Sequence, residues 1–167
     1  LACQPLEVRK RWLNVEEDTT DNGDIAYNVA MNQILTASNE HLVSYFTPIY
    51  NTGDKLWSTY RSLLEQTYED WEWVLVNDSS DGGKTLKIAE EIARRDSRVK
   101  VYDFREKTGG IIGESKYRAA CLTRGFLLAE LDHDDLLTDN CTQDLINATK
   151  AYPDAGFFFN DSVEINE

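Results

Sequence analysis

From His41 onward, short apolar runs typical of β-strands alternate with longer segments whose apolar residues have α-helical spacing. Strands are expected at residues 41–47, 71–76, 98–104, 126–131 and 155–161, and helices at 54–66, 84–96, 114–124 and 136–152. Repeated strand–helix alternation with short connections predicts an α/β fold. We expect a Rossmann-like open, mostly parallel sheet with helices on both faces.

Three residues set expected boundaries within this pattern. Pro48 should end the first strand, because proline has no backbone N–H to donate to a ladder. Asp54 is a candidate N-cap for the first helix. Gly125 is placed to end the third helix as a C′ glycine.

The chain of 167 residues is long enough for one compact domain with its own core. Residues 1–40 differ in character from the rest. Residues 15–24 form an acidic, polar run expected to be a solvated loop, and residues 25–35 have the spacing of a short amphipathic helix. We therefore expect an N-terminal extension of unknown role at 1–40 and one α/β domain at 41–167.

Composition excludes several classes of function. The net charge of -13 leaves no basic face to neutralise the phosphates of a nucleic acid, so no nucleic-acid partner is expected. No apolar run approaches the roughly 18 residues of a transmembrane helix, so none is expected. The three cysteines lack CxxC spacing, which favours reduced thiols and a cytoplasmic location. A phosphate-bearing ligand would need a metal ion beside this acidic protein.

Ligands of open parallel sheets bind in the loops that follow the carboxyl ends of the strands. In this chain those loops are residues 48–53, 77–83, 107–113 and 132–135. Two of the four carry aspartate directly after a strand, which makes this edge of the sheet the expected site.

The last of these loops holds three aspartates within four residues, Asp132, Asp134 and Asp135. If the extended conformation continues past Leu131, Asp132 and Asp134 project the same way and suit a hard divalent cation, Mg²⁺ or Mn²⁺. The alternative is that Asp134 or Asp135 caps the following helix. His133 is not favoured as a ligand, because alternation would point it away from both aspartates.

Two further residues have open alternatives. Asp78 closes the second strand, where a carboxylate could accept a hydrogen bond from a nucleobase imide or from ribose, or could simply form an Asx-turn. Lys116 lies early in the third helix and could reach a pyrophosphate or remain a solvated lysine. Neither a G-x-G-x-x-G fingerprint nor a P-loop occurs, which disfavours dinucleotide dehydrogenases and P-loop nucleotidases.

These motifs together resemble the family 2 glycosyltransferases with the GT-A fold. The resemblance rests on "VSYFTPIYNTGDKLWSTYRSLLEQTYEDWEWVLVNDSSDG", then "TGG" with "SKYRAACLTRG", then "AELDHDD", and covers roughly residues 41–161. It implies that residues 41–167 form a GT-A nucleotide-sugar-binding domain. The implied reaction transfers a sugar from a nucleotide diphosphate donor, usually a UDP-sugar, to a hydroxyl of a glycan or other acceptor.

The resemblance also implies roles for individual residues. Two positions depart from the family, because Thr108 stands where an Asn is common and Lys116 where an Arg is common. The implied nucleotide-sugar-binding residues are Thr47, Pro48, Tyr50, Asn51, Asp78, Thr108, Lys116 and Asp132, and the implied metal ligands, for Mn²⁺ or Mg²⁺, are Asp132 and Asp134. Such an ion stabilises the charge that develops on the nucleoside diphosphate as the sugar–phosphate bond breaks.

Inverting transfer needs a carboxylate general base, which in the family lies well beyond the D-x-D motif. Asp161 and Glu164 follow that motif here and are not expected to serve. The chain therefore resembles the donor-binding half of an enzyme, with the base outside it. The alternatives are a non-catalytic nucleotide-sugar-binding module and, less favoured because it lacks a glycine-rich N-terminal loop, a sugar-1-phosphate nucleotidyltransferase.

Overall fold

The computed structural model describes residues 39–164, so the loop expected at 15–24 and the helix expected at 25–35 lie outside the described residues. The described part contains a four-stranded parallel sheet in the order β3-β2-β1-β4. The strands are β1 (Asn39–Ile49), β2 (Trp71–Asn77), β3 (Val99–Tyr102) and β4 (Gly125–Glu130). The predicted parallel α/β sheet is confirmed.

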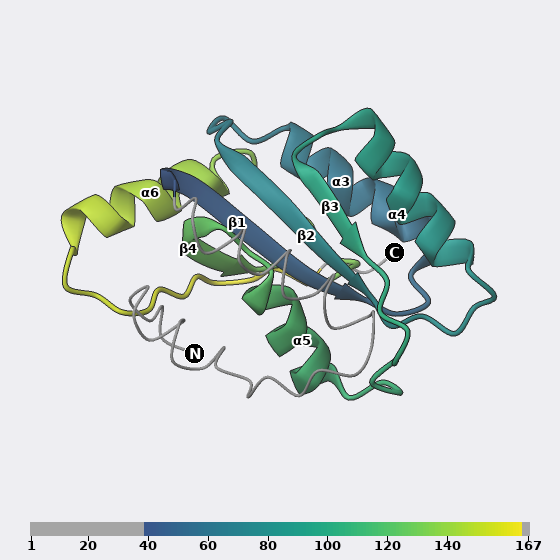
Figure 1. The fold of residues 1–167 in the computed structure, drawn as a ribbon. Helices are drawn as coiled ribbons and strands as arrows, with labels where there is room; N and C mark the ends of the chain where they lie inside the picture. The colour runs from purple at the N-terminus through teal and green to yellow at the C-terminus, as the bar shows by residue number, and fades with distance from the viewer. Residues whose placement is uncertain (1–38, 165–167) are drawn as a thin grey trace.

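Helices cover both faces of the sheet, as the sequence predicts (Figure 1). They are α3 (Leu56–Leu64), α4 (Lys84–Arg95), α5 (Ile112–Cys121) and α6 (Cys141–Ala151), and a 3-10 helix η1 (Gly53–Lys55) precedes α3. Residues of α3, α4 and α6 share one buried cluster with alternate residues of β1 and β2. Residues of α5 pack with Val74 and Val76 on the opposite face.

Strand order places the expected site at a topological switch point. The chain runs outward from β1 through β2 to β3, and then crosses back to add β4 on the other side of β1. The strand order therefore reverses between β1 and β4, and ligands of open α/β sheets bind at the carboxyl ends of the strands at such a point.

Three predicted boundaries are wrong. Pro48 lies inside β1, paired in register with Val76, instead of ending the strand. Asp54 lies within η1, and neither η1 nor α3 has a side-chain cap hydrogen bond. Gly125 opens β4, because α5 already ends at Cys121.

Gly125 is required by close packing between β1 and β4. A Cβ atom at this position would lie 2.3 Å from the backbone oxygen of Leu42 and 2.6 Å from Oγ of Ser44. The backbone N–H of Gly125 donates to that same Oγ at 2.7 Å. The glycine thus allows β4 to approach β1 and has no helix-ending role.

Two predicted elements at the carboxyl-terminal side also differ. The last helix begins at Cys141 and not at residue 136, with Asn140 at its N-cap. Residues 155–161 form no strand, and Phe157 and Phe159 are 65% and 87% exposed. The apolar run there pairs with no other strand among the described residues, and pairing is what a strand needs for stability.

A buried carboxylate connects β2 to β1 and to the start of β4. Glu72 of β2 is 1% exposed and accepts hydrogen bonds from Ser44 Oγ at 2.7 Å, from Arg124 N at 2.7 Å and from Arg124 Nε at 2.8 Å. Every donor lies on β1 or directly before β4. The guanidinium of Arg124 pairs with the charge of Glu72, as burial of a carboxylate requires.

Among the described residues, no helix combines the length and the apolar character needed to cross a membrane.

Candidate functional site

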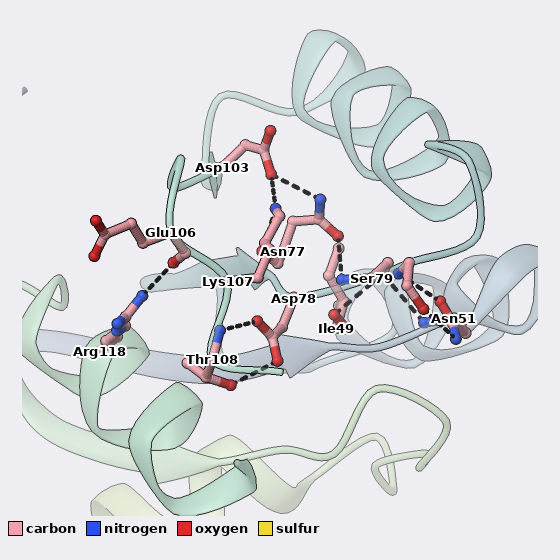
Figure 2. Close-up of polar contacts among 11 residues, drawn as sticks. Ile49, Asn51, Asn77, Asp78, Ser79, Asp103, Glu106, Lys107, Thr108 and Arg118 are labelled. Carbon is pink, nitrogen blue, oxygen red and sulfur yellow. Dashed lines mark hydrogen bonds and ion pairs between the residues drawn. The ribbon is translucent and has the colours of Figure 1, made fainter. Parts of the chain in front are cut away.

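Hydrogen bonds connect the loop after β1 to the loop after β2 (Figure 2). The carbonyl oxygen of Ile49 accepts from Asp78 N at 3.0 Å and from Ser79 Oγ at 3.2 Å. Asn51 has a φ of 54°, a left-handed conformation that asparagine tolerates. Its side-chain oxygen accepts from Ser80 N at 2.9 Å, so the two loops hold each other in place.

Asp78 connects the loop after β2 to the loop between β3 and α5. One carboxylate oxygen, Oδ1, accepts from Thr108 N at 2.6 Å. The other, Oδ2, accepts from Thr108 Oγ1 at 2.6 Å (Figure 2). Oδ2 also accepts from Gly110 N at 3.0 Å. A carboxylate has about four acceptor positions, two on each oxygen. Three are filled, which leaves one acceptor position on Oδ1 without a described partner.

The electrostatics of Asp78 favour the ionised form. Its burial, at 5% exposure, raises the pKa, but the hydrogen bonds from Thr108 and Gly110 and the charge of Lys107 outweigh that effect. The pKa of Asp78 is therefore lowered from its ordinary value. The carboxylate is available as an acceptor at neutral pH.

A second contact between the same two loops was not foreseen from the sequence. Asn77 Nδ2 donates to Asp103 Oδ1 at 2.8 Å, and Lys107 Nζ donates to the backbone oxygen of Asn77 at 2.8 Å (Figure 2). Lys107 also pairs with Asp103. Burial raises the pKa of Asp103, but the hydrogen bonds from Lys107 and Asn77 lower it by more. The net shift of this pKa is therefore downward. The only local signal was the position of Asn77 beside Asp78.

Thr47 and Pro48 act together at the end of the β1–β4 ladder. Leu131 N donates to Phe46 O at 3.4 Å. In a parallel ladder, the Leu131 carbonyl would next accept from the N–H of residue 48, which proline lacks. Thr47 Oγ1 takes that place and donates to Leu131 O at 2.5 Å.

Thr47 is therefore a core residue. It is 0% exposed, and its hydroxyl also accepts the indole N–H of Trp73 at 2.8 Å. Pro48 is buried as well. These two residues are buried at the sheet edge, whereas Tyr50 is 46% exposed, and the nucleotide-binding roles expected for all three stay predictions.

The aspartate loop leaves the sheet where the ladder stops. Asp135 N donates to Asp132 O at 3.2 Å, which closes a turn directly after Leu131. The extended conformation therefore does not continue, and strand alternation does not set the direction of Asp134. Because the N-cap of α6 is Asn140, neither Asp134 nor Asp135 caps a helix, and that alternative is wrong.

Asp132 and Asp134 have different partners. The ammonium of Lys116, in α5, lies 3.0 Å from Asp132 Oδ1 and 2.5 Å from Glu130 Oε1. Burial lowers the pKa of Lys116, but its hydrogen bonds to the two carboxylates raise it, and the net shift is upward. His133 Nδ1 lies 3.6 Å from Asp134 Oδ1, so His133 does not point away from Asp134 as alternation suggested.

Asp132 and Asp134 fit a metal site in which the protein supplies only two carboxylates and other ligands complete the shell. Within residues 39–164, no group of three or more His, Cys, Asp or Glu side chains is placed to hold a metal ion. Asp132 and Asp134 are two half-exposed carboxylates on one turn. Mg²⁺ is characteristically bound by one or two carboxylates, with water and phosphate oxygens completing its shell. Asp132 already pairs with a cation, the Lys116 ammonium.

Comparison with known proteins identifies the family. The model of "Glycosyl transferase family 2" matches residues 44–161. The chain is 35% identical over 94 residues to the putative teichuronic acid biosynthesis glycosyltransferase TuaG of Bacillus subtilis, covering 56% of this chain and 36% of that protein. It is 30% identical over 111 residues to the poly(ribitol-phosphate) β-N-acetylglucosaminyltransferase TarP of Staphylococcus aureus, covering 65% of this chain and 33% of that protein.

Solved structures agree with these sequence matches. The crystal structure of S. aureus TarS 1–349 in complex with UDP-GlcNAc superposes with a TM-score of 0.59 at 25% identity, over 66% of this chain and 32% of that one. The mannosyltransferase PcManGT of Pyrobaculum calidifontis, at 21% identity and a TM-score of 0.54, shares the fold over 89% of this chain and 39% of that one. The chain thus spans about a third of the length of these relatives. It belongs to glycosyl transferase family 2.

Proposed function

We propose that this chain is the donor-binding part of a metal-dependent glycosyltransferase that uses a UDP-sugar. One observation carries the proposal: an ionised carboxylate with one open acceptor position, Asp78, and two half-exposed carboxylates, Asp132 and Asp134, stand on loops at the same edge of the sheet. This edge includes the topological switch point. The complex of UDP-GlcNAc with TarS 1–349, which has the same fold, supports the choice of nucleotide.

In this proposal the nucleobase lies beside Asp78. The open position on Oδ1 accepts the imide N–H of uracil, while the Thr108 and Gly110 bonds keep the carboxylate from turning away. Tyr50 and Asn51 form the exposed rim on the β1 side. An imide N–H distinguishes uracil from cytosine, whose ring presents an acceptor at that position, so the carboxylate favours UDP over CDP.

The diphosphate lies toward the aspartate turn. Asp132 and Asp134 would hold a divalent ion, which supplies charge stabilisation for the departing nucleoside diphosphate. This arrangement resolves the electrostatic problem of a chain with net charge -13 that binds a dianionic group. Lys116 is the cationic side chain of α5 that contacts the turn.

An acceptor hydroxyl would attack the anomeric carbon from the face opposite the diphosphate and invert it. The base that removes the hydroxyl proton is not assigned to this chain. Asp161 and Glu164 lie on the exposed segment after α6, which no strand or helix holds near the turn.

The test uses nucleotide binding with and without metal. UDP should raise the melting temperature in Mn²⁺ and much less in EDTA, because a ligand bridged by the ion stabilises the fold only when the ion is present. Asp134→Asn is nearly isosteric and should weaken Mn²⁺-dependent UDP binding without lowering the melting temperature of the free protein. Asp135→Asn is the neighbouring control and should have the milder effect. Equal UDP stabilisation with and without metal, or unchanged binding in Asp134→Asn, would remove the metal from the proposal.

A further inference from the structure

The position of Lys116 relative to the aspartate turn has a consequence for metal binding. Glu130 and Asp132 flank Leu131, whose side chain is 3% exposed and packs in the cluster with α3 and α6. Glu130 and Asp132 both reach the side of the sheet that α5 covers, because their carboxylates contact one side chain of that helix. Lys116 meets them there and contacts both carboxylates.

We propose that Lys116 is a built-in competitor of the metal ion, occupying the cation position at Asp132 until the nucleotide binds. This inference rests on the proposed function and adds the order in which Lys116 and the metal ion occupy the position at Asp132. The ammonium of Lys116 lies 3.0 Å from Asp132 Oδ1. A divalent ion bound to that oxygen would therefore lie close to a like charge. A free metal ion must therefore displace Lys116 from Asp132.

Glu130 gives the displaced lysine a second partner. Its Oε1 lies 2.5 Å from Lys116 Nζ, so the ammonium can leave Asp132 and remain paired. The Lys116 side chain is only 21% exposed, and solvent alone would be a poor substitute. Glu130 thus lowers the cost of vacating Asp132, although it is not itself a metal ligand.

The nucleotide reverses the effect of the lysine. A metal–UDP complex brings a diphosphate whose negative charge exceeds what the ion neutralises, and the ammonium beside the turn then attracts it. Lys116 therefore opposes binding of the ion alone and favours binding of the ion with UDP. By linkage, each ligand then strengthens binding of the other, so metal and nucleotide bind with positive cooperativity.

The first experiment measures Mn²⁺ binding by the full chain without nucleotide, from the electron paramagnetic resonance signal of free Mn²⁺. Lys116→Gln should tighten Mn²⁺ binding by about three- to tenfold, as expected for removal of a nearby like charge. In saturating Mn²⁺, the same variant should bind UDP more weakly than wild type. Lys84→Gln is the matched control, because Lys84 forms an exposed pair with Asp54 at 3.1 Å and should change neither affinity.

The second experiment separates Glu130 as the partner of Lys116 from Glu130 as a metal ligand. Glu130→Gln should weaken Mn²⁺ binding, because the lysine then pairs with Asp132 alone. In the Lys116→Gln background, the same change should have no effect, which a double-mutant cycle measures. If Glu130→Gln weakens Mn²⁺ binding equally in both backgrounds, Glu130 binds the ion directly and the competitor scheme is overturned.

The outcomes distinguish this inference from the proposed function. Unchanged Mn²⁺ affinity in Lys116→Gln, with Mn²⁺-dependent UDP binding intact in wild type, overturns the competitor and leaves the proposed function standing. A Lys116→Gln variant that binds both Mn²⁺ and UDP more tightly overturns the nucleotide step. Absence of Mn²⁺ binding in both proteins overturns both proposals.

Discussion

The carboxylate of Asp78 accepts two hydrogen bonds from Thr108, one from its backbone N–H and one from its hydroxyl, each 2.6 Å long. With the third bond, from Gly110, these contacts fix the turn in which Gly109 and Gly110 both have positive φ, 69° and 88°. Asp78 is therefore a structural residue of the loop between β3 and α5 as well as the proposed nucleobase acceptor.

Asp78→Ala should consequently destabilise the protein and not only weaken UDP binding. Removal of the charged acceptor leaves the N–H groups of Thr108 and Gly110 without their partner, and we expect a loss of about 1–3 kcal/mol in the free energy of unfolding. Urea denaturation measures it. Thr108→Val, which removes one of the three bonds and keeps the backbone donor, should lose less. Full stability in Asp78→Ala would show that the loop does not depend on this carboxylate.

Asp78 should also contribute to acid sensitivity. Its folded pKa is below the unfolded value of about 3.9, so near that pH the unfolded chain binds more protons than the native one. Its contribution is complete above the unfolded pKa and is lost as pH falls through the folded pKa. Urea denaturation between pH 7 and pH 3 should show a smaller loss of stability on acidification in Asp78→Asn than in wild type. An identical pH dependence in the two proteins would contradict this origin.

Thr47→Val tests the hydroxyl that replaces the missing N–H of Pro48. Valine has nearly the same shape, but leaves the Leu131 carbonyl and the Trp73 indole N–H buried without partners. We expect destabilisation by about 2–4 kcal/mol, since each unsatisfied buried group costs roughly 1–3 kcal/mol. Thr47→Ser keeps the hydroxyl and should be milder. Calorimetry of both variants measures the two losses of stability. Equal stability of Thr47→Val and Thr47→Ser would show that the hydroxyl is not the cause.

Gly125→Ala tests the close approach of β4 to β1. The added methyl would lie 2.3 Å from a backbone oxygen, which cannot move without separating the strands. We expect a loss of at least about 1–3 kcal/mol, the usual cost of overpacking. At Gly156 an added Cβ would meet nothing within 4 Å, so Gly156→Ala is the control and should leave the melting temperature unchanged. Similar effects of the two substitutions would show that β1 and β4 tolerate the methyl group.

Much of the fold could be predicted from the sequence, because the buried strands are nearly continuous apolar runs. The run from Trp71 to Val76 has no polar residue except Glu72, and β2 lies where expected. The burial of Glu72 does not follow from the local sequence, since its partners Ser44 and Arg124 are distant in the chain. Pairings of this kind are set by strand order, which local patterns do not contain.

The errors at the site have a common physical origin in tertiary context. Pro48 was expected to end β1, but its missing donor faces only β4, and the pairing with β2 continues to Ile49. Asp132 and Asp134 were assigned one direction from strand periodicity, which ceases to apply in a turn. The site residues that the sequence predicts are those whose type alone indicates chemistry, such as Asp78 and Asp132, and their binding roles stay predictions.

The hydrogen bonds at the carboxyl edge also determine how this edge opens. Thr47 connects the ends of β1 and β4, Asn51 connects the loops after β1 and β2, and Asp78 connects the loops after β2 and β3. Each neighbouring pair of loops is thus joined by at least one side chain, and no loop can detach without breaking a bond to the next. In native-state hydrogen exchange, the amides of Asp78, Thr108 and Ser80 should exchange through one shared opening event, with similar protection, instead of as independent surface loops.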